Sequence, residues 1–363
     1  MTIQFNERRW KDIRDTYKRW WNRALERPVI NLTFIDAPSS MKQPENYRPI
    51  AMWQYPEETP INQILRDDLY TLSTQRFAAD AFPMTLPDYG AGVNAAFCGS
   101  KVERREETVW FLPPAPDIAM KNFHLKHDPG STLYMKLREY YKQSYKFFEG
   151  NAIVGMTHLN NGIDIPARFF EGNEMCLALY DYPDEVKRLT DESHRLFLYY
   201  LEDLSTYMGD VPGYSCWGHL YGEKPWFGTQ SDFCAMIGPD TFSEFILPEL
   251  KMCWQAFPET NYYHLDGPGQ LPHLDMILDS PSLRCVQWVP GDGAPLPAEW
   301  VEIYKRISNA GKNIWYMGKL EDIEGIADAI GTTRGLYWQG YMPWEYREHA
   351  RTILKHLGVT EEF

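Results

Sequence analysis

The chain has 363 residues, 44% of them hydrophobic and 24% charged, with a formal net charge of −14 at pH 7. This length suits one large barrel or two ordinary domains and is ample for a buried core. The acidic balance argues against broad contact with nucleic acid or an anionic membrane, because both need clustered Lys and Arg. No apolar run approaches the ~20 residues of a membrane span, and the first thirty residues lack the pattern of a secretory signal.

The six cysteines are scattered and form no C-x-x-C pair. This usage is typical of a reducing compartment, so we expect a cytoplasmic protein. From the charge and hydropathy above, we expect neither a nucleic-acid nor a membrane partner. Walker-type, G-x-G-x-x-G, H-E-x-x-H and G-x-S-x-G motifs are all missing from the sequence, which removes support for nucleotide cofactors and serine hydrolysis.

Regular elements are sparse in the first 130 residues. Residues 6–26 place apolar side chains at helical spacing, and 29–34 favour a first strand. A helix over 60–80 and a short strand over 108–112 follow. Ser131 is a suitable N-cap for a helix that continues to Glu149.

From residue 150 the pattern alternates between strands and helices. We expect strands at 151–156, 213–217, 261–266, 283–288, 313–317 and 335–338, and helices at 164–180, 183–208, 239–257, 270–278, 298–310, 320–330 and 343–357. Such alternation predicts a parallel sheet with helices outside it. About eight strands in one long chain favour a closed TIM (β/α)8 barrel.

No repeat, low-complexity segment or linker divides the sequence. We therefore expect a single α/β barrel domain over residues 1–363. Residues 1–130 would form an N-terminal helical and loop extension that caps one end and supplies the first barrel elements, and residues 150–357 would form the barrel core.

Polar or aromatic side chains recur where the predicted strands end. They are His158 and Asn160 after 151–156, Trp217 and His219 after 213–217 with Gln230 and Asp232 in the following loop, His264 and Asp266 in 261–266, Gln287 and Trp288 in 283–288, and Trp338 in the last strand. In a barrel, these ends carry the active site. Residues i and i+2 of a strand share a face, so His264 and Asp266 are expected to face one cavity.

Two chemistries fit His264 and Asp266. With His219 they could hold a divalent metal that acts as a Lewis acid. Without a metal they could be an acid/base and anchoring pair, with the carboxylate tuning the imidazole. Cys285 lies near the start of its strand, which favours burial over a ligand role. Aromatic residues such as Trp217 and Trp338 suit a pocket for a flat, cyclic or methylated ligand, and equally suit packing between layers.

Several segments together resemble the uroporphyrinogen decarboxylase-like superfamily. They are Gln230-Ser231-Asp232, Ile237-Gly238-Pro239-Asp240-Thr241-Phe242, Glu244-Phe245 with Pro248, His264-Leu265-Asp266-Gly267, Gln287-Trp288-Val289-Pro290-Gly291 and Ala310-Gly311-Lys312. The resemblance covers about residues 150–357 and implies a TIM barrel. The superfamily includes uroporphyrinogen decarboxylase and the corrinoid-dependent methyltransferases. Segments before residue 130 look like an uncharacterised branch of it: Trp20-Trp21, Arg27-Pro28-Val29-Ile30, Gly90-Ala91-Gly92 and Thr108-Val109-Trp110-Phe111.

The departures from the superfamily pattern bear on the reaction. The arginine-rich N-terminal segment that grips tetrapyrrole propionates in uroporphyrinogen decarboxylase has no counterpart here. Thiol-activating methyltransferases hold zinc with H-x-C and a distant cysteine. His264 matches that histidine, but Asp266 replaces the cysteine, and no cysteine follows Cys285. These differences argue against a thiolate-rich zinc site and leave a His/Asp metal site or a metal-free site.

The resemblance implies a methyltransferase-like enzyme for a small methylated or methoxylated organic compound, with a corrinoid protein or a folate as the methyl carrier. His264, Asp266 and His219 would be catalytic, and His264 and Asp266 the ligands of any divalent metal such as zinc. The alternatives are a metal-independent decarboxylase outside the haem pathway and a non-catalytic ligand-binding homologue. A homodimer is the base expectation for a soluble enzyme.

Overall fold

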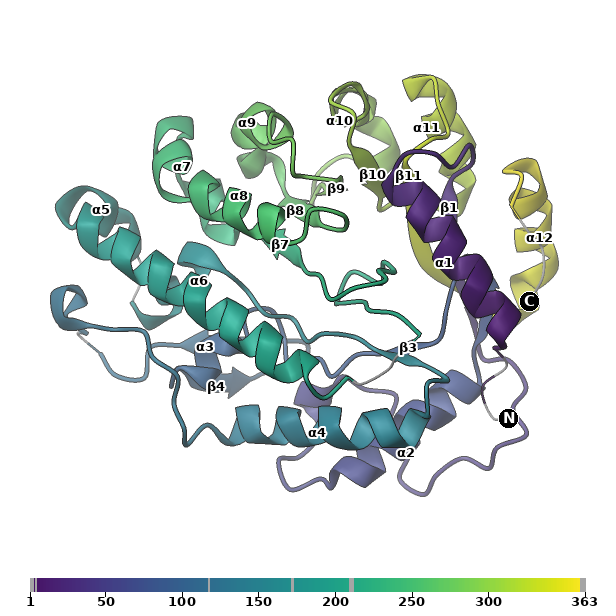
Figure 1. The fold of residues 1–363 in the computed structure, drawn as a ribbon, viewed down its shortest axis with the longest axis horizontal. Helices are drawn as coiled ribbons and strands as arrows, with labels where there is room; N and C mark the ends of the chain where they lie inside the picture. Colours follow the sequence, from purple (N-terminus) through teal and green to yellow (C-terminus); the bar gives the residue numbers. More distant parts are fainter. Residues whose placement is uncertain (1–2, 4, 117, 171–172, 209–211, 360–363) are drawn as a thin grey trace.

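The computed structural model describes residues 3, 5–116, 118–170, 173–208 and 212–359. A seven-stranded sheet forms the centre of the fold (Figure 1). Its strands, in spatial order, are β2 (Arg76–Ala79), β1 (Val29–Ile35), β11 (Leu336–Pro343), β10 (Asn313–Tyr316), β9 (Cys285–Val289), β8 (Tyr262–Asp266) and β7 (Gly228–Gln230). Neighbouring strands are parallel except for the β1–β2 pair, so the expected mixed α/β fold with a mostly parallel sheet is confirmed.

The predicted closed barrel is not confirmed, because β2 and β7 are the two edges of an open sheet in the described residues. Between these edges lie a short parallel pair, β3 (Met84–Thr85) with β6 (Ile153–Val154), and a single bridge from Met156 to Cys216. Hydrogen bonding therefore does not join the described strands into a closed barrel.

The expected strand at 213–217 is replaced by a chain reversal. Tyr214 pairs with Gly222 instead of with a neighbouring strand, and His219 adopts a positive φ of 48°. Gly213 packs under the Tyr221 ring, where a Cβ would lie 2.1 Å from a ring carbon. The tight turn therefore leaves too little extended backbone for residues 213–217 to form a β-ladder with a neighbouring strand. The expected strand at 108–112 also lies outside the sheet, where β5 (Val109–Leu112) forms a hairpin with β4 (Lys101–Arg104).

Helices cover the outside of the sheet, and Figure 1 shows α7 to α11 in an arc along it. The helices are α1 (Glu7–Trp21), α2 (Ile61–Ser73), α3 (Asn94–Phe97), α4 (Thr132–Phe148), α5 (Glu174–Asp181), α6 (Pro183–Ser205), α7 (Pro239–Phe245), α8 (Leu247–Ala256), α9 (Leu274–Leu278), α10 (Val301–Asn309), α11 (Ile323–Ile330) and α12 (Arg347–His356). The helix expected at 239–257 is interrupted near Pro248, since α7 ends at Phe245 and α8 begins at Leu247. Among the described residues, no helix is both long and apolar enough to cross a membrane.

Helix α1 packs against the amino-terminal end of the sheet. The Trp20 indole donates to the carbonyl of Leu336 at 3.0 Å, and the Asn313 amide donates to the carbonyl of Trp20 at 3.1 Å. Leu336 and Asn313 are the first residues of β11 and β10. The N-terminal segment therefore covers the end of the sheet opposite the carboxyl edge.

An aromatic layer fills the inner side of the sheet below its carboxyl edge. Ring centroids lie 5.3 Å apart for Tyr262 and Trp315, and 5.2 Å apart for Trp315 and Tyr337. All three side chains are buried. Strand alternation places His264 and Asp266 on the same face as Tyr262. The polar groups at the strand ends therefore lie directly above the buried aromatic layer.

Candidate functional site

Three neighbouring strands align polar side chains at the carboxyl edge of the sheet. In the strand register, His264 of β8 lies opposite Gln230 of β7 on one side and Gln287 of β9 on the other. Partners in register on parallel strands project from the same face. The row Gln230–His264–Gln287 therefore lies on one face, above the aromatic layer. His264 and Gln287 are at strand ends as expected, whereas Gln230, expected in a loop, is the last residue of β7.

Gln287 orients the His264 ring. His264 Nδ1 hydrogen-bonds Gln287 Oε1, and the Gln287 amide nitrogen lies 3.2 Å from the Met317 sulfur. The edge-on ring of Trp217 packs against the imidazole at a centroid distance of 5.4 Å. Since Gln287 Oε1 accepts from the Nδ1–H group, Nε2 is the ring nitrogen left for a reacting group.

His158 forms a second, neutral imidazole beside the row. Its ring stacks on Trp217 at 4.3 Å and 15°, and its Nε2 lies 3.1 Å from Gln230 Oε1. Burial, helped by the nearby His264, lowers the pKa of His158 to about 4. The neutral ring donates its Nε2 proton to Gln230, whose amide nitrogen lies 3.4–3.5 Å from the two Asp232 oxygens.

A buried carboxyl holds the loop that follows β7. Asp164 ends the 3₁₀ helix η3 (Gly162–Asp164) and accepts from the backbone N–H groups of Asp232 at 2.9 Å and Phe233 at 3.0 Å. Burial and the repulsion of Asp232 raise the pKa of Asp164 to about 7. Asp164 was not predicted as a site residue, although a carboxylate in the apolar run 162–166 after a strand end was a usable signal.

Asp232 places a carboxyl group next to Gln230 of the row. Its carboxyl group lies 3.9 Å from Arg168 Nη2. Burial raises the pKa of Asp232, while the charges of His264 and Arg168 oppose that rise. The site therefore combines a neutral His158 with carboxyl groups whose pKa values are raised, an arrangement that can hold and move protons near neutral pH.

His219 is held by contacts with β1 and β11 rather than with the row. Its backbone carbonyl accepts from the Asn31 amide and the Tyr337 hydroxyl, both at 3.0 Å. Its ring lies between the Trp217 carbonyl, 3.2 Å from Nδ1, and the Tyr341 hydroxyl, 3.4 Å from Nε2. These bonds tie the reversed segment to β1 and β11.

Three predicted binding residues are not brought to the row. Trp288 is fully buried on the opposite face of β9 from Gln287 and packs on Trp300 at 5.1 Å. Trp338 points away from the inner Tyr337, and its indole donates to the Gly318 carbonyl. Asn160 is buried where its backbone pairs with Asn94. Adjacent strand residues face opposite sides, which explains both tryptophans.

The metal hypothesis lacks a complete donor set at this edge. Within the described part of the chain, His264, Asp266 and His219 do not form a group of three with ligand atoms in mutual reach. A catalytic zinc takes three protein ligands as a rule. The residues present therefore do not fit such an ion here. Cys285 is fully buried, as expected.

The fold and site define a mixed α/β protein with polar groups at the carboxyl edge of a mostly parallel sheet. A solved structure with a similar fold is a methyltransferase from Methanosarcina mazei, with a TM-score of 0.58 over 92% of this chain and 94% of that chain. The two sequences are 11% identical, so the likeness concerns the fold. No protein-family profile matches the chain, and no curated protein matches its sequence.

Proposed function

We propose that the protein is a methyltransferase-like enzyme that acts on a small methylated or methoxylated organic compound, with a corrinoid protein or a folate as the methyl carrier. The observation that carries the proposal is the row Gln230–His264–Gln287 above the aromatic layer. The fold likeness to a methyltransferase over nearly the whole chain adds support. Substrate and carrier come from the sequence resemblance.

In the proposed reaction, His264 handles the proton of the leaving group. The carrier supplies the electron pair that bonds the methyl carbon, and the carbon–heteroatom bond breaks with its pair on the heteroatom. A protonated His264 gives its Nε2 proton to that heteroatom. The contact with Gln287 fixes the ring and leaves Nε2 for the leaving group. In the reverse direction His264 accepts the proton.

The surroundings of the row suit a small substrate. Trp217 packs beside the His264 ring, and the buried Tyr262 lies next to Trp217, with their ring centroids 5.2 Å apart. The side-chain amides of Gln230 and Gln287 are held in fixed directions by His158 and His264. Asp266 follows His264 on the same face of β8 and adds a second carboxylate. A metal held by His264 and Asp266 stays a prediction from the sequence, and no step above depends on it.

The test is methyl transfer with purified protein, a corrinoid-carrying partner and a panel of methylated donors, followed through the visible spectrum of the corrinoid. We expect methyl transfer by the wild type and its loss in His264→Ala. His349→Ala is the matched control, because His349 is exposed on α12 and pairs with Glu321. Full activity in His264→Ala would refute the site assignment, and tight binding without turnover would favour a ligand-binding homologue.

A metal-independent decarboxylase is the second candidate. It is favoured by the neutral His158 and the incomplete metal-donor set at the row, since proton transfer to a carbanion needs only such side chains. Release of carbon dioxide from a carboxylated donor, unaffected by chelators, would select this reaction over methyl transfer.

A further inference from the structure

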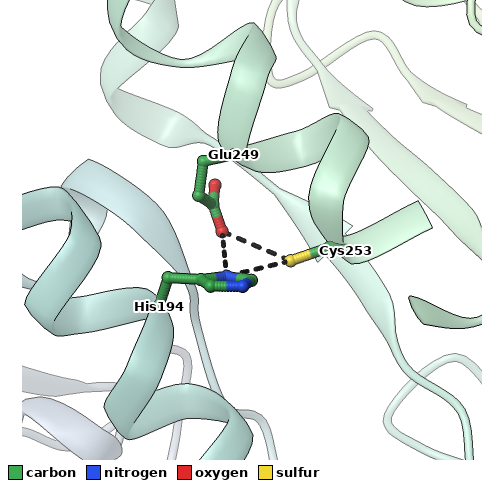
Figure 2. Close-up of side chains that lie close together, drawn as sticks. All are labelled: His194, Glu249 and Cys253. Atoms are coloured by element: carbon green, nitrogen blue, oxygen red, sulfur yellow. Dashed lines mark hydrogen bonds and ion pairs between the residues drawn. The ribbon is translucent and has the colours of Figure 1, made fainter. Parts of the chain in front are cut away.

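A compact group of metal-ligating side chains lies between two helices, apart from the histidine row. His194 comes from α6, and Glu249 and Cys253 come from α8, where a spacing of four residues places them on one face (Figure 2). Among the described residues, this is the group of three His, Cys, Asp or Glu whose ligand atoms all lie within 4.8 Å of one another. All three residues are buried.

The distances between the donor atoms match the edges of a metal site. His194 Nδ1 lies 3.3 Å from Glu249 Oε1 and 3.6 Å from Cys253 Sγ, and the sulfur lies 3.3 Å from the same oxygen. With Zn–S of about 2.3 Å, Zn–N of about 2.0–2.1 Å and Zn–O of about 2.0–2.2 Å, a tetrahedral ion holds its donors about 3.3–3.6 Å apart. The triangle therefore has the size that zinc requires.

A cation would also stabilise the buried carboxylate of Glu249. Glu249 is 4% exposed, and its Oε1 is met by His194, Cys253 and the Asn161 amide, the last at 2.5 Å. A carboxylate removed from water is costly unless a charge compensates it. Thr190 lies one helical turn before His194, and its buried hydroxyl has no hydrogen-bond partner in the described part of the structure.

We infer that His194, Glu249 and Cys253 bind a zinc ion that fastens α6 to α8. The mixed sulfur, nitrogen and oxygen donors suit zinc better than magnesium or calcium, which prefer oxygen alone. The fourth position can be taken by the second Glu249 oxygen or by a water, since 11% of the His194 side chain is exposed. Zinc binds the thiolate, so uptake releases the Cys253 proton to solvent.

The zinc site is linked to the row Gln230–His264–Gln287 through the chain that precedes Asp164. Asn161 hydrogen-bonds Glu249 and directly precedes η3, whose last residue, Asp164, holds the loop at Asp232. The ion would thus hold the element that positions Asp232. This role is structural and does not depend on the reaction catalysed at His264.

The test measures zinc by elemental analysis in the purified full chain after dialysis, and again after chelation and reloading. We expect one zinc per chain in the wild type, lost in Cys253→Ser and in His194→Gln. Cys216→Ser is the matched control, because Cys216 is equally buried and lies outside the cluster, and it should keep the ion. His264→Ala should also keep it, which separates this site from the proposed active site.

A second measurement guards against variants that fail to fold. Cobalt(II) loaded into the chelated wild type should give the near-ultraviolet charge-transfer band of a cobalt–thiolate bond, and reloading with zinc should raise the Tm. Zinc content unchanged in Cys253→Ser and His194→Gln would overturn the inference. So would a wild type that takes up neither metal, which would leave the three side chains as a hydrogen-bonded cluster.

Discussion

Asp164 accepts a hydrogen bond from the backbone N–H of Asp232 at 2.9 Å, while the carboxyl groups of the two residues repel each other. The backbone bond fixes the start of the loop after β7. The repulsion between the two carboxylates makes the ionised form of Asp164 less stable there. The same pair therefore both positions Asp232 and makes its position sensitive to protonation.

Stability should fall as pH rises through the titration of Asp164. Its folded-state pKa is about 7, above its ordinary value of 3.8, so the folded state takes up the proton more readily. The contribution of the protonated group is fully present below about pH 4 and is lost as pH rises through about 7. Asp232→Asn removes the repulsion and should flatten this dependence without abolishing it, because burial is the larger cause.

Urea unfolding of the wild type and Asp232→Asn across this pH range checks the prediction. The free energy of unfolding of the variant should change less between the two ends of the range. Parallel profiles for the two proteins would show that the two carboxyl groups do not interact.

His158 should remain neutral until the solution is strongly acidic. Its titration, followed by NMR of the imidazole carbons, should have a midpoint near a pH of about 4. Trp217→Ala removes the stacked ring and admits water, so the midpoint should move upwards. A wild-type midpoint near the ordinary value of 6.5 would mean that the ring is solvated.

The aromatic layer should dominate the stability of the sheet. Trp315→Ala is expected to lower the free energy of unfolding by ~3–5 kcal/mol, as for other buried aromatic truncations. Trp110→Ala is the control, because Trp110 is 43% exposed and contacts Arg105, and it should cost less than ~1 kcal/mol. Equal losses in denaturant unfolding would contradict the assignment of the core.

Gly162 should be intolerant of a side chain. It has a φ of +64°, and a Cβ there would lie 2.6 Å from Glu249 Oε2. Gly162→Ala should lower the free energy of unfolding by more than ~1 kcal/mol and reduce zinc retention. Gly325→Ala, in open space within α11, should instead stabilise by up to ~1 kcal/mol. Equal changes in the two variants would argue against the close approach of Glu249 to η3.

The sequence predicted His264, Asp266 and Gln287 at strand ends because strand alternation is a local property. His264 is two residues from Asp266, and parallel strands bring Gln230 and Gln287 alongside it. The same rule could have excluded Trp288, which is adjacent to Gln287 and must face the other side. The open sheet was not predictable, because the turn at His219 depends on bonds from Asn31 and Tyr337, far away in the chain.

The clusters that were missed depend on contacts between distant segments. Asp164 meets residues 232–233, and His194 meets Glu249 across 55 positions. Only the spacing of Glu249 and Cys253 on one helix was visible in the sequence. A pair at four-residue spacing is common, and the third donor comes from helix packing that no local pattern encodes.

The most direct test of the central claim is the single-turnover rate of methyl transfer to a corrinoid carrier by the wild type and His264→Ala, with a methylated donor that the wild type accepts. General acid–base catalysis contributes ~10²–10⁴-fold, so the variant should be slower by that factor, while Gln287→Met should lose less because it only disturbs the ring orientation. An unchanged rate in His264→Ala would contradict the proposed role of the row Gln230–His264–Gln287.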